Sequence, residues 1–422
     1  MRILVYPIRL AIGGAQINAV DLATGVRDLG HDVIVFSRPG PLIGVVRRHG
    51  LRYIQAPRPG PVRPSVAVMR ALRRVAVGEG IDLVHAWGPN PWLEAFYSVQ
   101  ITTGIPLVAS FMDMTYVNHL PKTGPLIVGT PHVLGEARRA RRGRVEVIEP
   151  PIDTDENHPS VDGSGFRRGH DIGPTEFVIV IVSRLALHLK LESLERIIEA
   201  TAALAREIPV RLAVVGDGPA RPALEARAQA VNQGLGREIV TLTGAMADPR
   251  PAYAAADVVV GMGSSILRGL AFEKPSLVLG ERGFWMLVSP ETIDRFLSEG
   301  FYGIGDGNAS TESFCAELRE LLEDAPRRRE LGQFSRTLVC ERFSVRAASL
   351  SLERLYQDIA SHPVPVAASL IDGAGTALRL LLDKTSGRPR PAAARLSRGV
   401  ESALEPEAGQ WPRPALRRRD EP

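Results

Sequence analysis

Short runs of β-branched and aliphatic residues alternate along the chain with longer segments whose apolar residues recur at helical spacing. In the first 150 residues these runs predict strands at 3–6, 33–36, 81–85, 105–109 and 145–148. A helical stretch opens at Gly13-Gly14 and ends before Gly30. Apolar strands that alternate with helices are typical of a parallel sheet covered on both faces.

The same alternation starts again at Phe177. Strands are predicted at 177–182, 210–215, 239–242, 258–260 and 276–279, and helices at 191–208, 220–233 and, with breaks, 311–359. A Pro-Pro pair and a polar stretch up to Gly173 separate the two halves, so we predict a linker over 156–175. The pattern therefore predicts an α/β protein with Rossmann-like domains at 1–155 and 176–362.

Composition changes after residue 362, where Ala, Arg, Pro and Gly dominate. Residues 369–384 predict one more helix, and the rest of 363–422 is typical of a disordered tail. The leucines at 380–382 and their arginine neighbours leave weak peripheral membrane contact open. A surface helix followed by a solvated tail is the favoured interpretation.

Bulk composition excludes several function classes. Hydrophobic residues make up 45% of the 422 residues and charged residues 23%, as in an ordinary globular protein. The net charge of +4 suits an anionic ligand and does not indicate nucleic-acid binding. Cys315 and Cys340 predict neither a disulfide framework nor a metal site, and no histidine has metal-ligand spacing. The first residues enter a strand pattern directly, so we expect a cytoplasmic protein. We also expect neither a metal nor a cofactor.

Two cations follow the first strand of the second half. Arg184 and Lys190 would lie at the carboxyl edge of a parallel sheet, where open α/β folds bind ligands. Cations at this edge can neutralise a diphosphate leaving group as its charge grows in the transition state. The position alone does not distinguish them from solvated cations at a strand end, and their prediction as catalytic residues rests on the family resemblance described below.

Glycines mark two further loops. Gly216 and Gly218 flank Asp217 in a tight turn between a strand and a helix. Gly13 and Gly14 precede a helix start, where a ligand can approach the backbone and meet free N–H groups. A dinucleotide fingerprint would need a third glycine at this first loop, and the chain has none at that spacing.

These motifs, with Tyr253-Ala254-Ala255-Ala256-Asp257 before the strand at 258, resemble the retaining glycosyltransferases of family 4, the glycosyl transferases group 1. The resemblance implies a GT-B fold, in which two Rossmann-like domains face each other across a cleft. It implies metal-independent transfer of a sugar from a UDP- or GDP-sugar bound by the second domain to an acceptor bound by the first.

The resemblance also assigns roles to the glycine loops. Gly216 and Gly218 would approach the nucleotide of the donor. The first-domain loop with Gly13, Gly14 and Gln16 would contact the phosphates or the acceptor.

The donor loop at 261–275 departs from the family pattern. It is short, it lacks the usual pair of glutamates, and Arg268 stands where the second is expected. An arginine cannot accept hydrogen bonds from ribose hydroxyls, but it can grip a phosphate. One branch of the family has a similar short loop, so we predict that backbone amides near Gly263, Ser264 and Ser265 bind the diphosphate.

The first domain departs from the family as well. Met112 occupies a position where many relatives have a histidine near the reaction centre, and Asp113 follows it. Asp113 is a candidate acceptor contact or base, and a helix cap is an equal alternative. His85 matches a family histidine at a strand end, with a substrate role and a structural role both open.

A glycosyltransferase acting on a small-molecule or glycan acceptor is the hypothesis these residues favour. Two alternatives stay open: transfer to a thiol or aminocyclitol, and a non-catalytic relative that binds a nucleotide or a partner protein. A nucleotide-sugar 2-epimerase shares the fold but lacks the glycine turn in this setting. We expect no nucleic-acid partner, and a homodimer stays open.

Overall fold

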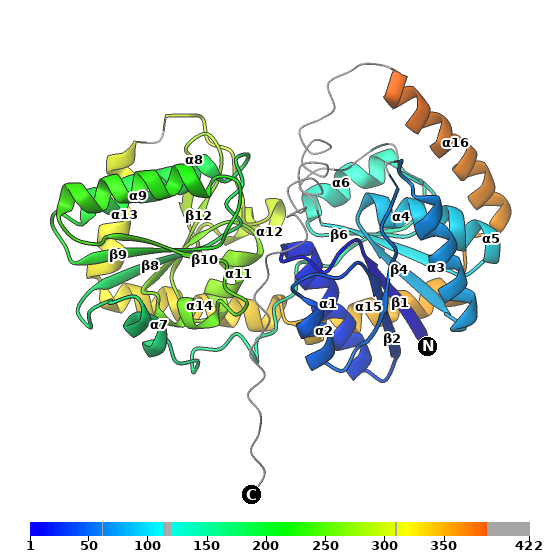
Figure 1. The fold of residues 1–422 in the computed structure, drawn as a ribbon, viewed down its shortest axis with the longest axis horizontal. Helices are drawn as coiled ribbons and strands as arrows, with labels where there is room; N and C mark the ends of the chain where they lie inside the picture. The colour runs from blue at the N-terminus through cyan, green and yellow to red at the C-terminus, as the bar shows by residue number, and fades with distance from the viewer. Residues whose placement is uncertain (61, 113–115, 117, 119, 309, 386–422) are drawn as a thin grey trace, which may run out of the picture. The chain divides into compact units, whose positions relative to one another are not determined.

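The computed structural model describes residues 1–60, 62–112, 116, 118, 120–308 and 310–385. Two sheets, one in each half of the chain, carry the architecture (Figure 1). This confirms the predicted α/β class with two Rossmann-like domains.

The first sheet has seven parallel strands in the order β3-β2-β1-β4-β5-β6-β7. Its strands are β1 (Arg2–Pro7), β2 (Asp32–Ser37), β3 (Arg52–Gln55), β4 (Leu83–Trp87), β5 (Leu107–Phe111), β6 (Leu126–Val128) and β7 (Val145–Val147). The helices of this half are α1 (Gly14–Asp28), α2 (Ile43–Arg48), α3 (Val66–Gly78), α4 (Pro89–Ala95), the π-helix η1 (Phe96–Gln100), α5 (Ile101–Thr103) and α6 (Pro131–Ala140).

The second sheet has the order β10-β9-β8-β11-β12-β13. Its strands are β8 (Phe177–Val182), β9 (Val210–Val215), β10 (Val240–Gly244), β11 (Val258–Gly261), β12 (Ser276–Leu279) and β13 (Trp285–Leu287). The helices after the first half are α7 (Ser164–Gly169), α8 (Leu191–Leu204), α9 (Arg221–Leu235), α10 (Arg250–Ala255), α11 (Ser264–Ala271), α12 (Ile293–Glu299), α13 (Thr311–Glu323), α14 (Ala325–Arg342), α15 (Val345–Ser361) and α16 (Val366–Thr385).

Both sheets are buried on their two faces, which explains their continuous apolar strands. In β8, Ile179 and Ile181 join one core while Val178 and Val180 join the core on the opposite face. Because successive side chains of a strand point to opposite faces, a strand buried on both sides needs no polar alternation. Such strands therefore lack the alternation of apolar and polar residues and appear in the sequence as continuous apolar runs.

The predicted strands 177–182, 210–215 and 276–279 coincide with β8, β9 and β12. Three strands were not predicted: β3, β6 and β13. The last pairs antiparallel to β12, so the second sheet is not wholly parallel. Each of the three has only three or four residues, and β3 also has a polar residue at each end.

The segment predicted as a linker, 156–175, is partly folded onto the second half. It contains α7, which packs against α10. Phe166 and Ile172 are buried in the same core as Val178. Arg167 donates to the carbonyl of Ala255 and pairs with Asp257 at 3.0 Å.

Helix α15 packs on the first half, although the predicted boundary at residue 362 assigns it to the second. It contacts α1, and Leu352 and Tyr356 join the core beneath β1. Gly25 of α1 allows this approach, because a Cβ there would lie 2.1 Å from Ser349 Oγ. Among the described helices, none alone is long and apolar enough to cross a bilayer; α15 and α16 pass that test only as a pair bent by 107°.

Candidate nucleotide-sugar site

The loops that follow β8 and β11 start side by side at the carboxyl edge of the second sheet. These strands are neighbours, and the strand order reverses at β8. Ligands of doubly wound sheets bind at such a switch point, because the two loops diverge and leave a crevice. Arg184 and Lys190 follow β8, while Gly263 and Ser264 follow β11. The tertiary structure therefore brings the two predicted donor loops to one edge.

Arg184 and Lys190 form a pair of like charges. No carboxylate pairs with either of them among the described residues, and Lys190 directly precedes α8. Removal from water and, to a smaller extent, the charge of Arg184 together lower the pKa of Lys190 to about 7. Desolvation also lowers the pKa of Arg184. Two adjacent, partly desolvated cations are stabilised by a bound anion.

The turn at Gly216 and Gly218 holds the Arg184 loop. Both glycines have positive φ, +147° and +153°. A Cβ at Gly216 would lie 1.8 Å from the carbonyl oxygen of Ser183, and one at Gly218 would lie 2.5 Å from that of Leu185. Glycine is therefore required here by the neighbouring loop. Direct contact between this turn and a nucleotide stays a prediction.

The start of α11 offers two backbone donors. The N–H of Gly263, which we had placed in the diphosphate cradle, donates to the carbonyl of Phe301 at 2.6 Å. Because that amide already donates a hydrogen bond within the protein, fewer amides are available for a diphosphate than we predicted. The described residues offer no backbone acceptor to the amides of Ser264 and Ser265. These two N–H groups lie at the positive end of the helix dipole.

The first turn of α1 lies close to the start of α11. A Cβ at Gly14 would lie 3.1 Å from Ser264 Oγ, so glycine keeps this approach open. Gln16 bends back over its own helix start, since its Oε1 would lie 2.5 Å from a Cβ at Gly13. The amino ends of both helices thus meet near one point, and their dipoles favour a negative charge there.

Arg268 faces carboxylates, which its sequence position did not reveal. Burial is the main cause that raises the pKa of Asp21, on α1, and the charges of Asp153 and Glu156 act in the same direction. The charge of Arg268 opposes the rise, and the resulting pKa is about 7. Arg268 therefore compensates an acidic cluster, which argues against the phosphate contact that we had predicted for it.

His85 is enclosed by protein. Its Nδ1 lies 2.6 Å from the hydroxyl of Tyr356 on α15, and its Nε2 lies 2.7 Å from Ser110 Oγ. Burial lowers its pKa to about 3, so the ring is neutral. With both ring nitrogens bonded, His85 anchors α15 to the first sheet, and these contacts favour its structural role.

Two first-domain predictions remain, Met112 and Asp113. Met112 packs against the apolar core of the first half, and a Cβ on Gly129 would lie 3.2 Å from its sulfur. Asp113 lies outside the described residues. In the part of the chain that the structure describes, no three His, Cys, Asp or Glu side chains are grouped to hold a metal ion.

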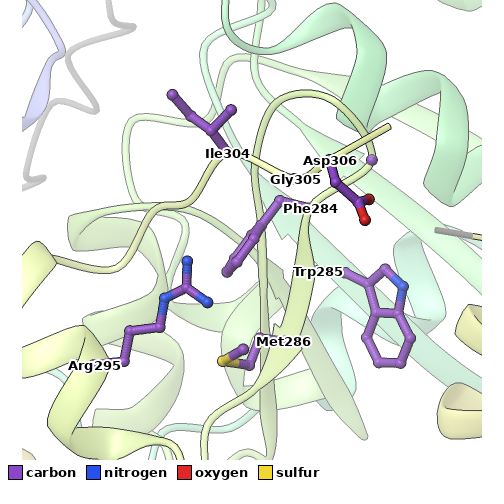
Figure 2. A pocket seen from close by; sticks show the side chains of 8 residues that line it. Phe284, Trp285, Met286, Arg295, Ile304, Gly305 and Asp306 are labelled. Atoms are coloured by element: carbon purple, nitrogen blue, oxygen red, sulfur yellow. The ribbon is translucent and has the colours of Figure 1, made fainter. Parts of the chain in front are cut away.

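A groove lies beside β13 (Figure 2), and neither Arg184 nor Lys190 is among the residues that line it. It has a volume of about 320 Å³ and is lined by Gly283, Phe284, Trp285, Met286, Arg295, Ile304, Gly305 and Asp306. Glu192, on the first turn of α8, accepts the N–H of Gly283 at 2.6 Å and so ties this wall to the helix that follows Lys190. None of the lining residues was predicted as a site residue. Arg295 stacks 4.9 Å above the Phe284 ring and pairs with Glu299 at 3.0 Å. Its charge is therefore already engaged, unlike the charges of Arg184 and Lys190, which no carboxylate of the described residues pairs with.

Two family models match the chain. Residues 12–156 match Glycosyltransferase Family 4, and residues 176–324 match Glycosyl transferases group 1. The two matches fall on the two sheets in turn. No curated protein matches the chain at a significant level.

Solved structures share the fold at low identity. A glycosyltransferase from Rickettsia africae ESF-5 superposes with a TM-score of 0.68 at 16% identity, over 86% of this chain and 99% of its own. HepE from Anabaena, in complex with UDP-glucose, gives 0.65 at 18% identity, over 85% and 100%. WaaG, a glycosyltransferase involved in lipopolysaccharide biosynthesis, gives 0.60 at 17%, over 82% and 99%. These likenesses show a GT-B arrangement of the two halves.

Proposed function

This chain belongs to the family 4 glycosyltransferases, nucleotide-sugar-dependent enzymes of GT-B fold, and on that basis we propose that it transfers a hexosyl group from a UDP-sugar to a hydroxyl acceptor without a metal ion. The choice of UDP follows HepE, whose structures hold UDP or UDP-glucose. GDP is the second donor nucleotide to test.

One observation carries this proposal: Arg184 and Lys190 share a switch-point loop with no carboxylate beside them among the described residues. A nucleoside diphosphate brings the negative charge that this pair lacks. Bound there, the diphosphate also meets the amides of Ser264 and Ser265. The charge needed to stabilise a leaving diphosphate is then supplied by side chains and amides.

The chemistry breaks one bond and makes one. The bond between the anomeric carbon and the diphosphate oxygen breaks, and the electron pair leaves with the nucleoside diphosphate. The acceptor oxygen bonds to the anomeric carbon and releases its proton. Arg184 and Lys190 lower the barrier because the charge that they hold grows as the bond breaks.

We propose a retaining outcome with help from the leaving group. Met112, at the position where relatives have histidine, cannot take a proton. In a retaining transfer the acceptor arrives on the face from which the diphosphate departs. An oxygen of the departing diphosphate can therefore take the acceptor proton.

Titration calorimetry with UDP, GDP, ADP and dTDP tests the donor. We expect selective micromolar binding of UDP. Arg184→Ala and Lys190→Ala should each weaken it about 10- to 150-fold, corresponding to about 1.5–3 kcal/mol for hydrogen bonds to a charged group. Arg329→Ala, an exposed arginine on α14, is the matched control and should change nothing. Equal losses in all three variants would contradict the site.

Turnover separates this proposal from a non-catalytic relative. The missing acidic pair and the engagement of Arg268 with Asp21 motivate that second candidate. We expect slow release of UDP from UDP-glucose, unaffected by EDTA and faster with an acceptor. Binding of UDP without release of sugar from UDP-glucose, UDP-galactose or UDP-N-acetylglucosamine would favour the non-catalytic protein.

A further inference from the structure

Helix α16 turns its polar residues toward the protein and its apolar residues toward solvent. On its inner side Ser369 and Thr376 are fully buried and Asp372 is 8% exposed. On its outer side Ile371 is 76% exposed and Leu378 is 58% exposed. This arrangement is the reverse of an ordinary surface helix, whose apolar stripe faces the core. Packing against the protein therefore does not explain why the outer residues of α16 are apolar.

The inner side is held mainly by hydrogen bonds. Asp372 accepts the N–H of Lys122 at 2.6 Å and both the N–H and the hydroxyl of Thr123 at 2.8 Å. Gln100 on η1 donates to Ser369 Oγ at 3.0 Å. Close approach is possible because Gly373 lies against Tyr97, Phe96 and Ile101. These bonds set the rotation of α16, so its outer face is fixed.

That outer face contains no polar residue between positions 366 and 382. The exposed positions of this stretch are Val366, Ala367, Leu370, Ile371, Ala374, Ala377, Leu378, Leu381 and Leu382. They recur at helical spacing and form one continuous apolar ridge. An exposed apolar surface of this kind marks an interaction site in a folded protein.

Basic residues accompany the ridge. Helix α3 packs on η1, as α16 does, and its ionisable side chains are all arginines: Arg70, Arg73 and Arg74. Arg73 donates to Thr102 on α5, the short helix that α16 also contacts (Figure 1). In sequence, residues 386–422 contain eight arginines against five carboxylates. The described helix that shares the η1 and α5 contacts of α16 is thus cationic, and the chain that follows α16 in sequence is rich in arginine.

We propose that α16 is a membrane-docking helix that lies flat on an anionic lipid surface, with its apolar ridge among the acyl chains and the α3 arginines at the headgroups. Apolar residues on one side and cations beside them are the features of helices that bind at the interface. The helix does not span, because it passes the length and composition test only with α15, and α15 packs on α1. A second copy of the chain fits less well, because a two-fold interface on the ridge would bring two sets of arginines together.

Vesicle sedimentation of the full chain tests this proposal. We expect binding to vesicles of phosphatidylglycerol and phosphatidylcholine, little binding to pure phosphatidylcholine, and weaker binding in 0.5 M salt. Ile371→Glu with Leu378→Glu should reduce the bound fraction at least tenfold. Ile304→Glu with Leu187→Glu, two exposed apolar residues of the second half, is the matched control and should bind as before.

Several outcomes would overturn the proposal. Unchanged vesicle binding of the Ile371/Leu378 variant, with a normal melting temperature, would show that the ridge is not the contact. A dimer in analytical ultracentrifugation that this variant abolishes, without vesicle binding of the parent chain, would identify a second copy as the partner. Vesicle binding only after deletion of 386–422 would show that this segment covers the ridge. None of these readouts depends on nucleotide binding, so the donor proposal is tested separately.

Discussion

The charges of Lys190 and Arg184 repel each other within one loop, and no carboxylate pairs with either of them in the described part of the chain. This relationship costs folding stability, because each charge is partly removed from water and the two repel. A bound diphosphate reverses the sign of the interaction.

Nucleotide binding should take up a proton above neutral pH. Free Lys190 has a pKa of about 7, and a bound diphosphate raises it, so at pH 8 binding adds protons to the protein. Affinity for UDP should fall between pH 7 and pH 9, by at most about tenfold per unit. Calorimetry in buffers of different ionisation enthalpy measures this uptake. Lys190→Arg, which stays charged, should show none.

The same lysine should be a stability liability. Its folded pKa lies below the unfolded value, so its cost is fully present below pH 7 and is relieved as pH rises toward 10.5. Lys190→Met should therefore raise the melting temperature at pH 6 by about 2 °C or more, with little gain at pH 10. The same variant should lose UDP affinity. A melting temperature that falls at both pH values would argue against this account.

Replacing Arg268 by glutamate, the residue that relatives carry, should harm this protein. The new carboxylate would join Asp21, Asp153 and Glu156 in one cluster. Because Asp21 is protonated below its pKa of about 7, we expect a larger drop in melting temperature at pH 8 than at pH 5. Scanning calorimetry at both pH values measures it.

Asp21→Asn provides the check on that cluster. Added to Arg268→Glu, it should recover most of the lost melting temperature at pH 8, since it removes the carboxylate that the new glutamate would repel. Arg329→Glu on α14 is the charge-matched control. A loss equal at both pH values and not recovered by Asp21→Asn would point to packing and not to charge.

Tyr356→Phe should loosen α15 from the first sheet. The change leaves the buried Nδ1 of His85 without its partner, which costs about 1–3 kcal/mol of unfolding free energy. Urea unfolding measures the loss. Tyr116→Phe is a control, because the buried Tyr116 hydroxyl has no partner among the described residues. Equal effects of both substitutions would refute a specific role for the His85 bond.

The His85 site also sets a pH limit. Its pKa is lowered to about 3 in the folded chain, so the unfolded chain binds the extra proton between pH 3 and 6.5. Stability contributed by neutral His85 is therefore complete above pH 6.5 and is lost as pH falls. Urea midpoints measured from pH 7 down to pH 4 follow this loss.

Local pattern was sufficient for the elements and for the reaction class. The strand 177–182 follows from an uninterrupted apolar run, because a strand buried on both faces needs no polar position. The strand 210–215 has the same apolar character and is interrupted only by Arg211. The cations at 184 and 190 could be placed at a sheet edge, because parallel strands put their carboxyl ends together. The short strands β3 and β6 were not predicted, although β7, which is as short as β6, was.

Tertiary structure alone decided what each site residue touches. Whether the amide of Gly263 is free depends on Phe301, and whether His85 can meet a substrate depends on Tyr356, 271 residues further along the chain. The charge of Arg268 acts on Asp21, which belongs to another helix. The apolar side of α16 faces solvent because Asp372, on its opposite side, accepts the N–H of Thr123. Periodicity reports which residues share a face of their own element. Which neighbour covers that face is settled by packing between distant segments, and hydrogen-bond partners and pKa values follow from that packing.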